Sequence, residues 1–233
     1  MVSYMSRDTS LSKAFSDPAA VARYAEGPPR KVPGFADLQR MAMLLLSERA
    51  PGAADILVLG AGGGLELKLF AEGRPDWRLT GVDPSAAMLD LARVTLGSLA
   101  PRIALLQGYI DDAPSGPFDG AACLLTLHFL AEEERRRTLR AVRQRLRPAA
   151  RFVMAHYSFP LDEAGRWLAR SAAFAASSGL DPAQASASAA VIMERLPILS
   201  PAQDEALLCA AGFSDVELFY AGFAFRGWVG TAS

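Results

Sequence analysis

The sequence predicts an α/β fold: a doubly wound, seven-stranded mixed sheet whose last strand is antiparallel, with a helical lid. Three observations predict it. Short apolar runs alternate with helical patterns over residues 51–157, a glycine loop follows the first of these runs, and the last two runs lie too close together for a helical crossover. Near-continuous apolar strands separated by helices are typical of a parallel sheet that is covered on both faces.

The composition fits a single domain over residues 1–233. The chain is 51% hydrophobic, and 24 basic against 25 acidic side chains leave a formal net charge of −1, so no overall attraction to nucleic acid is expected. The two cysteines lie in apolar stretches and indicate neither a disulfide framework nor a metal site. No stretch resembles a secretion signal or is long enough to span a bilayer, so we expect a cytoplasmic protein without a membrane partner.

The elements follow in order along the chain. Residues 1–50 are expected to form an N-terminal arm, broken by four prolines before residue 35, and an amphipathic helix over residues 35–50. Residues 51–157 carry the alternating strands and helices of the core. The predicted strands of this core are Asp55–Leu59, Arg78–Asp83, Ile103–Gln107, Phe118–Leu125 and Arg151–Tyr157.

The alternation stops after Tyr157. Residues 158–199 are rich in alanine and serine, with helical stretches broken by Gly179 and Pro182, and are predicted to form a helical lid inserted on the sheet. Residues 200–233 are predicted to form the final helix and a β-hairpin. The hairpin strands are expected at Ser214–Tyr220 and Phe223–Val229, turning through Ala221 and Gly222, after a helix that Ser200 caps and Pro201 begins and that runs to Ala211.

A glycine loop is the strongest chemical signal. Gly60, Gly62 and Gly64 follow a buried strand and open a helix, so backbone amides and the positive helix end can approach a ligand closely. The next predicted strand ends at Asp83, which in a doubly wound sheet lies beside this loop and can accept hydrogen bonds from a ribose diol. The alternatives are a tight turn without a ligand and an aspartate that only caps a helix.

The spacing also bears on which nucleotide is bound. The dinucleotide fingerprint needs glycine or alanine three residues after Gly62, but residue 65 is leucine. A nicotinamide-dependent dehydrogenase is therefore the weaker enzyme hypothesis.

The order of these motifs resembles a class I S-adenosylmethionine-dependent methyltransferase with its Rossmann-like sheet. The motifs are LVLGAGGG, TGVDPSAAMLDLAR, LLQGYIDDAP, FDGAACLLTLHFL and RQRLRPAARFVMAHYSF, followed by AGFSDVELFYAGFAFRGWVGTA. Within that superfamily the chain is most similar to the carboxy-S-adenosylmethionine synthase branch of tRNA wobble-uridine modification, through RKVPGF near the N-terminus, TLHFLAEEER and AGFSDVELFYAGFAF.

The resemblance implies that S-adenosylmethionine is the cofactor and that residues 51–157 are the cofactor-binding core. It implies that the methionyl and ribose parts lie on the glycine loop and Asp83, that the adenine is flanked by residues after the second and third strands, and that the N-terminal arm closes over the methionyl end. The implied cofactor-binding residues are Arg30, Phe35, Gly60, Ala61, Gly62, Gly64, Asp83, Pro84, Met88, Tyr109, Ile110 and Leu124. The resemblance also makes a homodimer possible.

Methyl transfer from a sulfonium needs positioning and exclusion of water, and a base only when the acceptor must lose a proton. The candidate catalytic residues are His128, His156 and Tyr157, because the pattern places them at the carboxyl ends of the fourth and fifth strands, where such sheets bind ligands. The alternative is that each is an ordinary polar group in the core. No metal site is expected.

Departures from the synthase branch favour ordinary methyl transfer. The positions that are usually acidic are Val58 and Tyr109, the usual asparagine is Leu124, and Ala190 stands where the branch has an arginine for the extra carboxylate of its donor. A buried carboxylate without a partner costs several kcal/mol. We therefore expect a methyltransferase acting on a small-molecule acceptor, with no nucleic-acid partner. A carboxy-S-adenosylmethionine synthase-like enzyme and a non-catalytic cofactor-binding protein stay open as alternatives.

Overall fold

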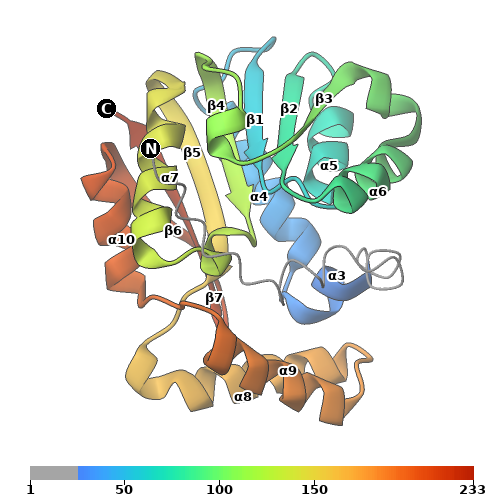
Figure 1. The fold of residues 1–233 in the computed structure, drawn as a ribbon, viewed down its shortest axis with the longest axis vertical. Helices are drawn as coiled ribbons and strands as arrows, with labels where there is room; N and C mark the ends of the chain where they lie inside the picture. Colours follow the sequence, from blue (N-terminus) through green and yellow to red (C-terminus); the bar gives the residue numbers. More distant parts are fainter. Residues whose placement is uncertain (1–25) are drawn as a thin grey trace, which may run out of the picture.

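The structure is a computed structural model that describes residues 26–233, so the first half of the predicted N-terminal arm lies outside the described residues. Its centre is a seven-stranded sheet (Figure 1). The strands are β1 (Asp55–Leu59), β2 (Arg78–Asp83), β3 (Ile103–Gln107), β4 (Phe118–Leu124), β5 (Leu146–Tyr157), β6 (Phe213–Gly222) and β7 (Phe225–Ala232). They lie in the order β3-β2-β1-β4-β5-β7-β6, and β7 alone runs antiparallel to both of its neighbours. This confirms the predicted mixed sheet with an antiparallel last strand.

Most strand bounds match the prediction, and the main difference is the start of β5. The strand begins at Leu146, which pairs with Phe118 across a register shift, five residues before the predicted start. Ala149 has a positive φ of 64° in this irregular segment. Pro148 and the left-handed backbone of Ala149 are not features of a regular strand, and a bulged segment accommodates both. The sequence pattern therefore did not predict this first part of β5.

The hairpin turn lies two residues later than predicted. Gly222 still pairs with Phe225, so the turn is made by Phe223, with φ of 51°, and Ala224. The glycine has a different role: a Cβ on Gly222 would lie 2.3 Å from the hydroxyl oxygen of Tyr220. Gly222 is therefore required by packing, and the prediction of a turn through Ala221 and Gly222 was wrong.

Helices cover both faces of the sheet, as a doubly wound fold requires. The α-helices of residues 26–233 are α3 (Gly27–Lys31), α4 (Phe35–Ser47), α5 (Leu65–Gly73), α6 (Ala86–Leu96), α7 (Glu132–Gln144), α8 (Ala164–Ser177), α9 (Pro182–Arg195) and α10 (Pro201–Ala210). Short 3-10 turns are η2 (Gly97–Arg102), η3 (Ile110–Asp112), η4 (Leu127–Phe129) and η5 (Leu161–Glu163). One core lies between the sheet and α7 and α10, and a second lies between the sheet and α4 and α5.

Two of the predicted helix signals are visible in the structure. Ser200 caps α10 in a capping box with Gln203, directly before Pro201. Gly179 and Pro182 separate α8 from α9, and the Asp181 side chain accepts a hydrogen bond from the backbone amide of Gln184 at 2.9 Å. The helix predicted over residues 35–50 ends three residues earlier, at Ser47.

The lid consists of α8 and α9, which lie together across the end of the sheet where β5 finishes, with α3 beside α8 (Figure 1). A small apolar cluster joins the lid to the hairpin turn through Phe159, Leu168 and Ala224. This places the lid over the carboxyl edge of the parallel strands, which is the edge where doubly wound sheets bind ligands. Within residues 26–233, no helix is long and apolar enough to cross a membrane.

Candidate functional site

The glycine loop joins β1 to α5 and depends on left-handed backbone. Gly60, Gly62 and Gly64 have φ values of 74°, 48° and 79°. The amides of Gly60 and Ala61 donate to the carbonyl oxygen of Val82 at 2.8 and 3.1 Å, which ties the loop to the end of β2. Because these glycines carry no side chains, the backbone of the loop and the start of α5 can be approached closely by a ligand.

Asp83 lies against this loop, as the sequence predicts. Its two carboxylate oxygens accept hydrogen bonds at 2.9 Å from the backbone amides of Gly62 and Ser85. Burial raises the pKa of Asp83, although these two amides act in the opposite direction. The cap of α6 is made by the side chain of Ser85, which accepts from the amide of Met88, so Asp83 orders the loop instead of capping the helix.

The loops after β2 and β3 also meet at this edge. The amide of Gly108 donates to the carbonyl oxygen of Asp83 at 3.1 Å. Of the residues that the resemblance places around the adenine, Pro84 and Tyr109 are exposed, whereas Met88 and Ile110 are each only 2% exposed. Tyr109 is therefore accessible to a ligand, whereas the side chains of Met88 and Ile110 are covered by protein.

The end of β4 completes the edge next to the glycine loop. Leu124 is 5% exposed and packs in the core on the α4 and α5 side. Beyond it, Thr126 lies so close to Gly60 that a Cβ on the glycine would be 2.1 Å from the threonine Oγ1. The structure thus brings the predicted residues of β1, β2, β3 and β4 together at one edge.

Arg30 and Phe35 lie at the other side of this edge, on α3 and at the start of α4. Arg30 forms an exposed ion pair with Glu26 at 3.6 Å, with 46% of its side chain exposed. Phe35 is half-buried against the core of the α4 and α5 side. Their predicted contact with the methionyl end of a cofactor stays a prediction.

His156 lies behind His128, with its ring centroid 6.4 Å from that of His128. It is fully buried, with its Nε2 3.1 Å from Oδ2 of Asp204 in α10, and Asp204 Oδ1 lies 2.6 Å from Nη1 of the fully buried Arg135. The imidazole also packs beside Trp228. The prediction that His156 faces the ligand edge was wrong, because its side chain points into the core between the sheet and α10.

His128 and Tyr157 lie together near the lid. Nδ1 of His128 accepts a hydrogen bond from the backbone amide of Tyr157 at 3.4 Å, and the two rings meet edge to face at 5.1 Å. Burial, with smaller contributions from His156 and Arg135, lowers the pKa of His128 well below its usual value, so the imidazole is neutral at pH 7. Burial raises the pKa of Tyr157, so its phenol stays protonated and acts as a hydrogen-bond donor or acceptor.

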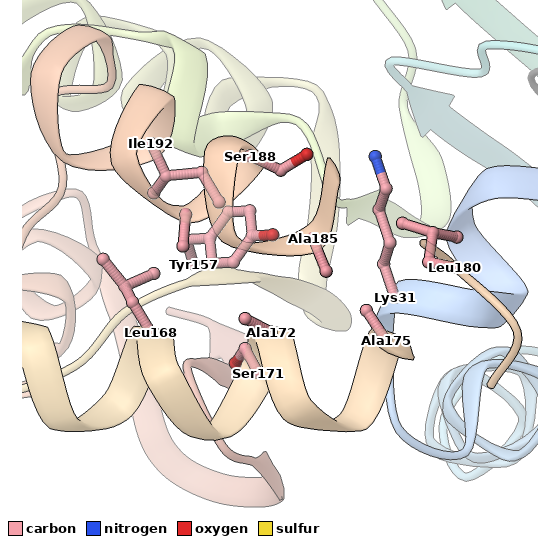
Figure 2. A pocket seen from close by; sticks show the side chains of 11 residues that line it. Lys31, Tyr157, Leu168, Ser171, Ala172, Ala175, Leu180, Ala185, Ser188 and Ile192 are labelled. Carbon is pink, nitrogen blue, oxygen red and sulfur yellow. The ribbon is translucent and has the colours of Figure 1, made fainter. Parts of the chain in front are cut away.

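A pocket lies between the lid helices, α3 and the end of β5. It is narrow, with a cavity volume of about 20 Å³, room for about one water molecule, and it is partly open to solvent. Its lining residues are Lys31, Tyr157, Leu168, Ser171, Ala172, Ala175, Leu180, Ala185, Ser188, Ala189 and Ile192. Figure 2 shows the Tyr157 hydroxyl directed toward the side of the pocket on which Lys31 lies. Lys31 is the only charged residue in this lining.

Two residues of the site were assigned no role from the sequence. Lys31 adjoins Arg30 in the RKVPGF segment, and only the packing of α3 against α8 brings it to the pocket. Glu66, the second residue of α5, is 8% exposed. The sequence shows an acidic residue two positions after the last glycine of the loop, but it does not show that this residue is buried.

The arginines of the lid helices do not line the pocket. Ala190 and Arg195 are exposed on α9. The guanidinium groups of Arg166 and Arg170 lie over the Trp167 ring, 6.0 and 4.8 Å from its centroid, and both side chains are exposed. The cation that faces the pocket is therefore Lys31.

Known proteins provide a comparison for this geometry. Residues 56–149 match the sequence model of a family described as a methyltransferase domain. The chain is 31% identical over 157 residues to the carboxy-S-adenosyl-L-methionine synthase of Chromohalobacter salexigens, covering 65% of this chain and 58% of that protein. It is 28% identical over 147 residues to the synthase of Campylobacter lari, covering 63% and 59%. The chain thus spans about three fifths of the length of these curated relatives.

Solved structures show the same fold at lower identity. Human N-acetylserotonin methyltransferase in complex with SAM superposes with a TM-score of 0.69 at 13% identity, covering 98% of this chain and 60% of that one. The pyocyanin biosynthetic protein PhzM superposes with a TM-score of 0.66 at 19% identity, covering 96% and 61%. The seven-stranded sheet and its flanking helices therefore have the arrangement of the methyltransferase fold.

Proposed function

We propose that this protein binds S-adenosylmethionine and transfers its methyl group to a small-molecule acceptor, because residues 56–149 match the model of a family described as a methyltransferase domain and the chain has the fold of solved methyltransferases. The observation that carries the proposal is the left-handed glycine loop, whose Gly62 amide donates a hydrogen bond to the carboxylate of Asp83 at the carboxyl edge of the parallel strands. The residues fit this cofactor. A side chain at Gly60 or Gly64 would collide with Thr126 or Ala92, so backbone alone can form the loop beside the cofactor.

When bound, S-adenosylmethionine supplies a methyl group that is already activated by the sulfonium. Asp83 would hold the ribose hydroxyls, because a carboxylate oxygen that accepts one amide proton keeps a second lone pair. The glycine loop would hold the methionyl part, and the lid would exclude water from the acceptor. Tyr157 would orient the acceptor through its hydroxyl. His128 would position Tyr157, because the one lone pair of its neutral imidazole, on Nδ1, accepts the Tyr157 backbone amide. The predicted role of His128 as a base stays a prediction, because Nδ1 would first have to release that amide.

The first test is the affinity for the cofactor measured by calorimetry. Replacing Asp83 with alanine is expected to weaken S-adenosylmethionine binding by about 1.5–3 kcal/mol, the range for hydrogen bonds to a charged group. Asp90→Ala is the matched control, because Asp90 forms an exposed pair with Arg93 on the adjoining helix. Unchanged affinity in Asp83→Ala would remove the ribose assignment, and binding of NAD in place of S-adenosylmethionine would favour a dehydrogenase.

The lining of the lid pocket favours a small acceptor that carries an acidic group. The cavity of about 20 Å³ has room for about one water molecule, so the proposal requires α8 and α9 to move apart when the acceptor binds. The lining is mainly aliphatic, and its single charge is the ammonium of Lys31. A carboxylate on an otherwise apolar acceptor would pair with Lys31 near the Tyr157 hydroxyl. Neither the composition nor this lining has the basic and aromatic surface that nucleic acids favour.

Acceptor preference is measured by methyl transfer to matched pairs of small carboxylic acids and their amides. The wild-type protein is expected to prefer the acids, and Lys31→Met is expected to lose that preference about tenfold, because a charge-assisted hydrogen bond is lost. Lys68→Met on α5 is the control, since Lys68 does not line the pocket. Equal use of acids and amides by the wild type would contradict the acceptor class, and binding without turnover on any acceptor would favour a non-catalytic protein.

A carboxy-S-adenosylmethionine synthase-like activity is the second candidate. Two observations favour it: the curated relatives carry that name, and Lys31 offers a cation to the lid pocket. The exposed Ala190 argues against it, because alanine has no positively charged group to pair with the extra carboxylate of the donor. Mass spectrometry of the ligand retained through purification separates the two activities, since the synthase product is heavier than S-adenosylmethionine by one carbon dioxide.

Sedimentation would test for the homodimer.

A further inference from the structure

Glu66 is a buried acidic residue next to the glycine loop, and the proposed methyl transfer gives it no role. It is the second residue of α5, directly after the loop, and is 8% exposed. Asp83 at the end of β2 and Cys123 in β4 are the titratable groups that interact with it electrostatically. Its carboxyl accepts a hydrogen bond from its own backbone amide, and within residues 26–233 no Lys, Arg or His nitrogen lies within ion-pair distance of it.

This placement is unfavourable for an ionised carboxyl in the free protein. Burial, partly offset by the backbone amide, raises the pKa of Glu66 to about 8, and the neighbouring Asp83 adds to the increase. The positive end of α5 compensates only in part, because a helix end carries about half an elementary charge. A cation placed beside Glu66 would remove the cost of ionising it.

The two acids at this edge differ in what they have left to bind. Each oxygen of Asp83 already accepts one backbone amide, which orders the loop and leaves one lone pair on each oxygen for the ribose hydroxyls. Within residues 26–233, no other residue donates a hydrogen bond or forms an ion pair with the Glu66 carboxyl, and Glu66 lies two positions after Gly64, in the first turn of α5. A ligand with a charged N–H donor on the loop side would satisfy it, because an ammonium supplies three donors and a positive charge.

We infer that Glu66 is the counter-ion of the ammonium group of the bound cofactor's methionyl part. The inference rests on the proposed function, since it needs S-adenosylmethionine on the glycine loop. S-adenosylmethionine has two positive centres, the sulfonium and the ammonium, and only the ammonium can donate hydrogen bonds. Glu66 therefore acts as a binding residue that recognises the amino-acid end of the cofactor, whereas Asp83 recognises its ribose.

Three ligands distinguish this role by calorimetry. S-adenosylmethionine has both positive centres, S-adenosylhomocysteine has the ammonium alone, and 5′-methylthioadenosine has neither. Glu66→Gln is expected to weaken the first two about tenfold or more, as loss of a charged hydrogen bond does, and to leave 5′-methylthioadenosine within about twofold. The amide is nearly isosteric and uncharged, so the fold is expected to tolerate it. Glu72→Gln on the same helix is the control, because Glu72 is exposed.

Each other outcome overturns the inference. Equal weakening of all three ligands means that Glu66 acts on the loop or the nucleoside, and weakening of S-adenosylmethionine alone means that it faces the sulfonium. Unchanged affinities mean that it binds no part of the cofactor. A wild-type protein that binds none of the three ligands refutes the proposed function itself, which separates the two failures.

The pH dependence of binding gives a second readout. Glu66 must lose its proton to pair with the ammonium, so S-adenosylhomocysteine affinity is expected to rise from pH 6 to 7.5 in the wild type, while the ligand's ammonium remains largely protonated. Asp83 and Cys123 are present in both proteins, so their contributions cancel in the comparison with Glu66→Gln. The variant is expected to show a flat profile, and an equal rise in both proteins would contradict the assignment.

Discussion

Replacing Asp204 with alanine is expected to lower the free energy of unfolding by about 3–5 kcal/mol, because it leaves a buried charge without its partner. Arg135, His156 and Asp204 are each fully buried, and the carboxylate lies 2.6 Å from the guanidinium and 3.1 Å from the imidazole. Burial by itself would raise the pKa of Asp204, but His156 and Arg135 hold it below its usual value. The alanine variant keeps the guanidinium of Arg135 in the core with only the carbonyl oxygens of Leu130 and Pro197 to accept from it.

Urea unfolding followed by circular dichroism measures this change. Cys209→Ala on α10 is the control, since Cys209 is exposed on the same helix. The double variant Arg135→Met, Asp204→Leu is expected to be more stable than Asp204→Ala, because it removes both charges and leaves no ion unpaired. A loss of less than about 1 kcal/mol in Asp204→Ala, the size of an exposed pair, would show that the buried ion cluster does not stabilise the fold.

Replacing Gly60 with alanine is the change expected to disturb the cofactor edge most. The left-handed φ of 74° costs a non-glycine residue about 1–2 kcal/mol. The new Cβ would also lie 2.1 Å from Oγ1 of Thr126, and overpacking of this kind costs about 1–3 kcal/mol. Relief requires a shift of the loop away from the end of β4, so S-adenosylmethionine affinity is expected to fall together with the unfolding free energy.

Thermal unfolding and calorimetry on the same preparations test both effects. Gly52→Ala is the control, because a Cβ at Gly52 meets no atom within 4 Å. Adding Thr126→Ser to Gly60→Ala is expected to recover part of the loss, since it removes the methyl group 2.6 Å from the new Cβ. If Gly60→Ala matched the wild type in both measurements, the loop would not be held in the conformation described.

The sequence by itself determined the sheet and its ligand edge. The first three strands coincide with the predicted Asp55–Leu59, Arg78–Asp83 and Ile103–Gln107. Buried parallel strands are continuous apolar runs, and the residues that end each run follow it directly in the sequence. The same local information placed Asp83 beside Gly62. The glycine spacing and the strand order are enough to predict that Asp83 lies beside Gly62, since parallel strands end at one edge of the sheet.

Only the tertiary structure decided which side chains face that edge. His156 and Tyr157 are neighbours in sequence, yet one lies in the core against Asp204 and the other lines the lid pocket, because successive residues of a strand point to opposite faces. Which of these faces is covered depends on α10, whose Asp204 lies 48 positions after His156 along the chain. Lys31 and Glu66 were missed for the same physical reason. Their roles depend on burial and on the packing of α3 and α5 against distant elements, and no local pattern records either property.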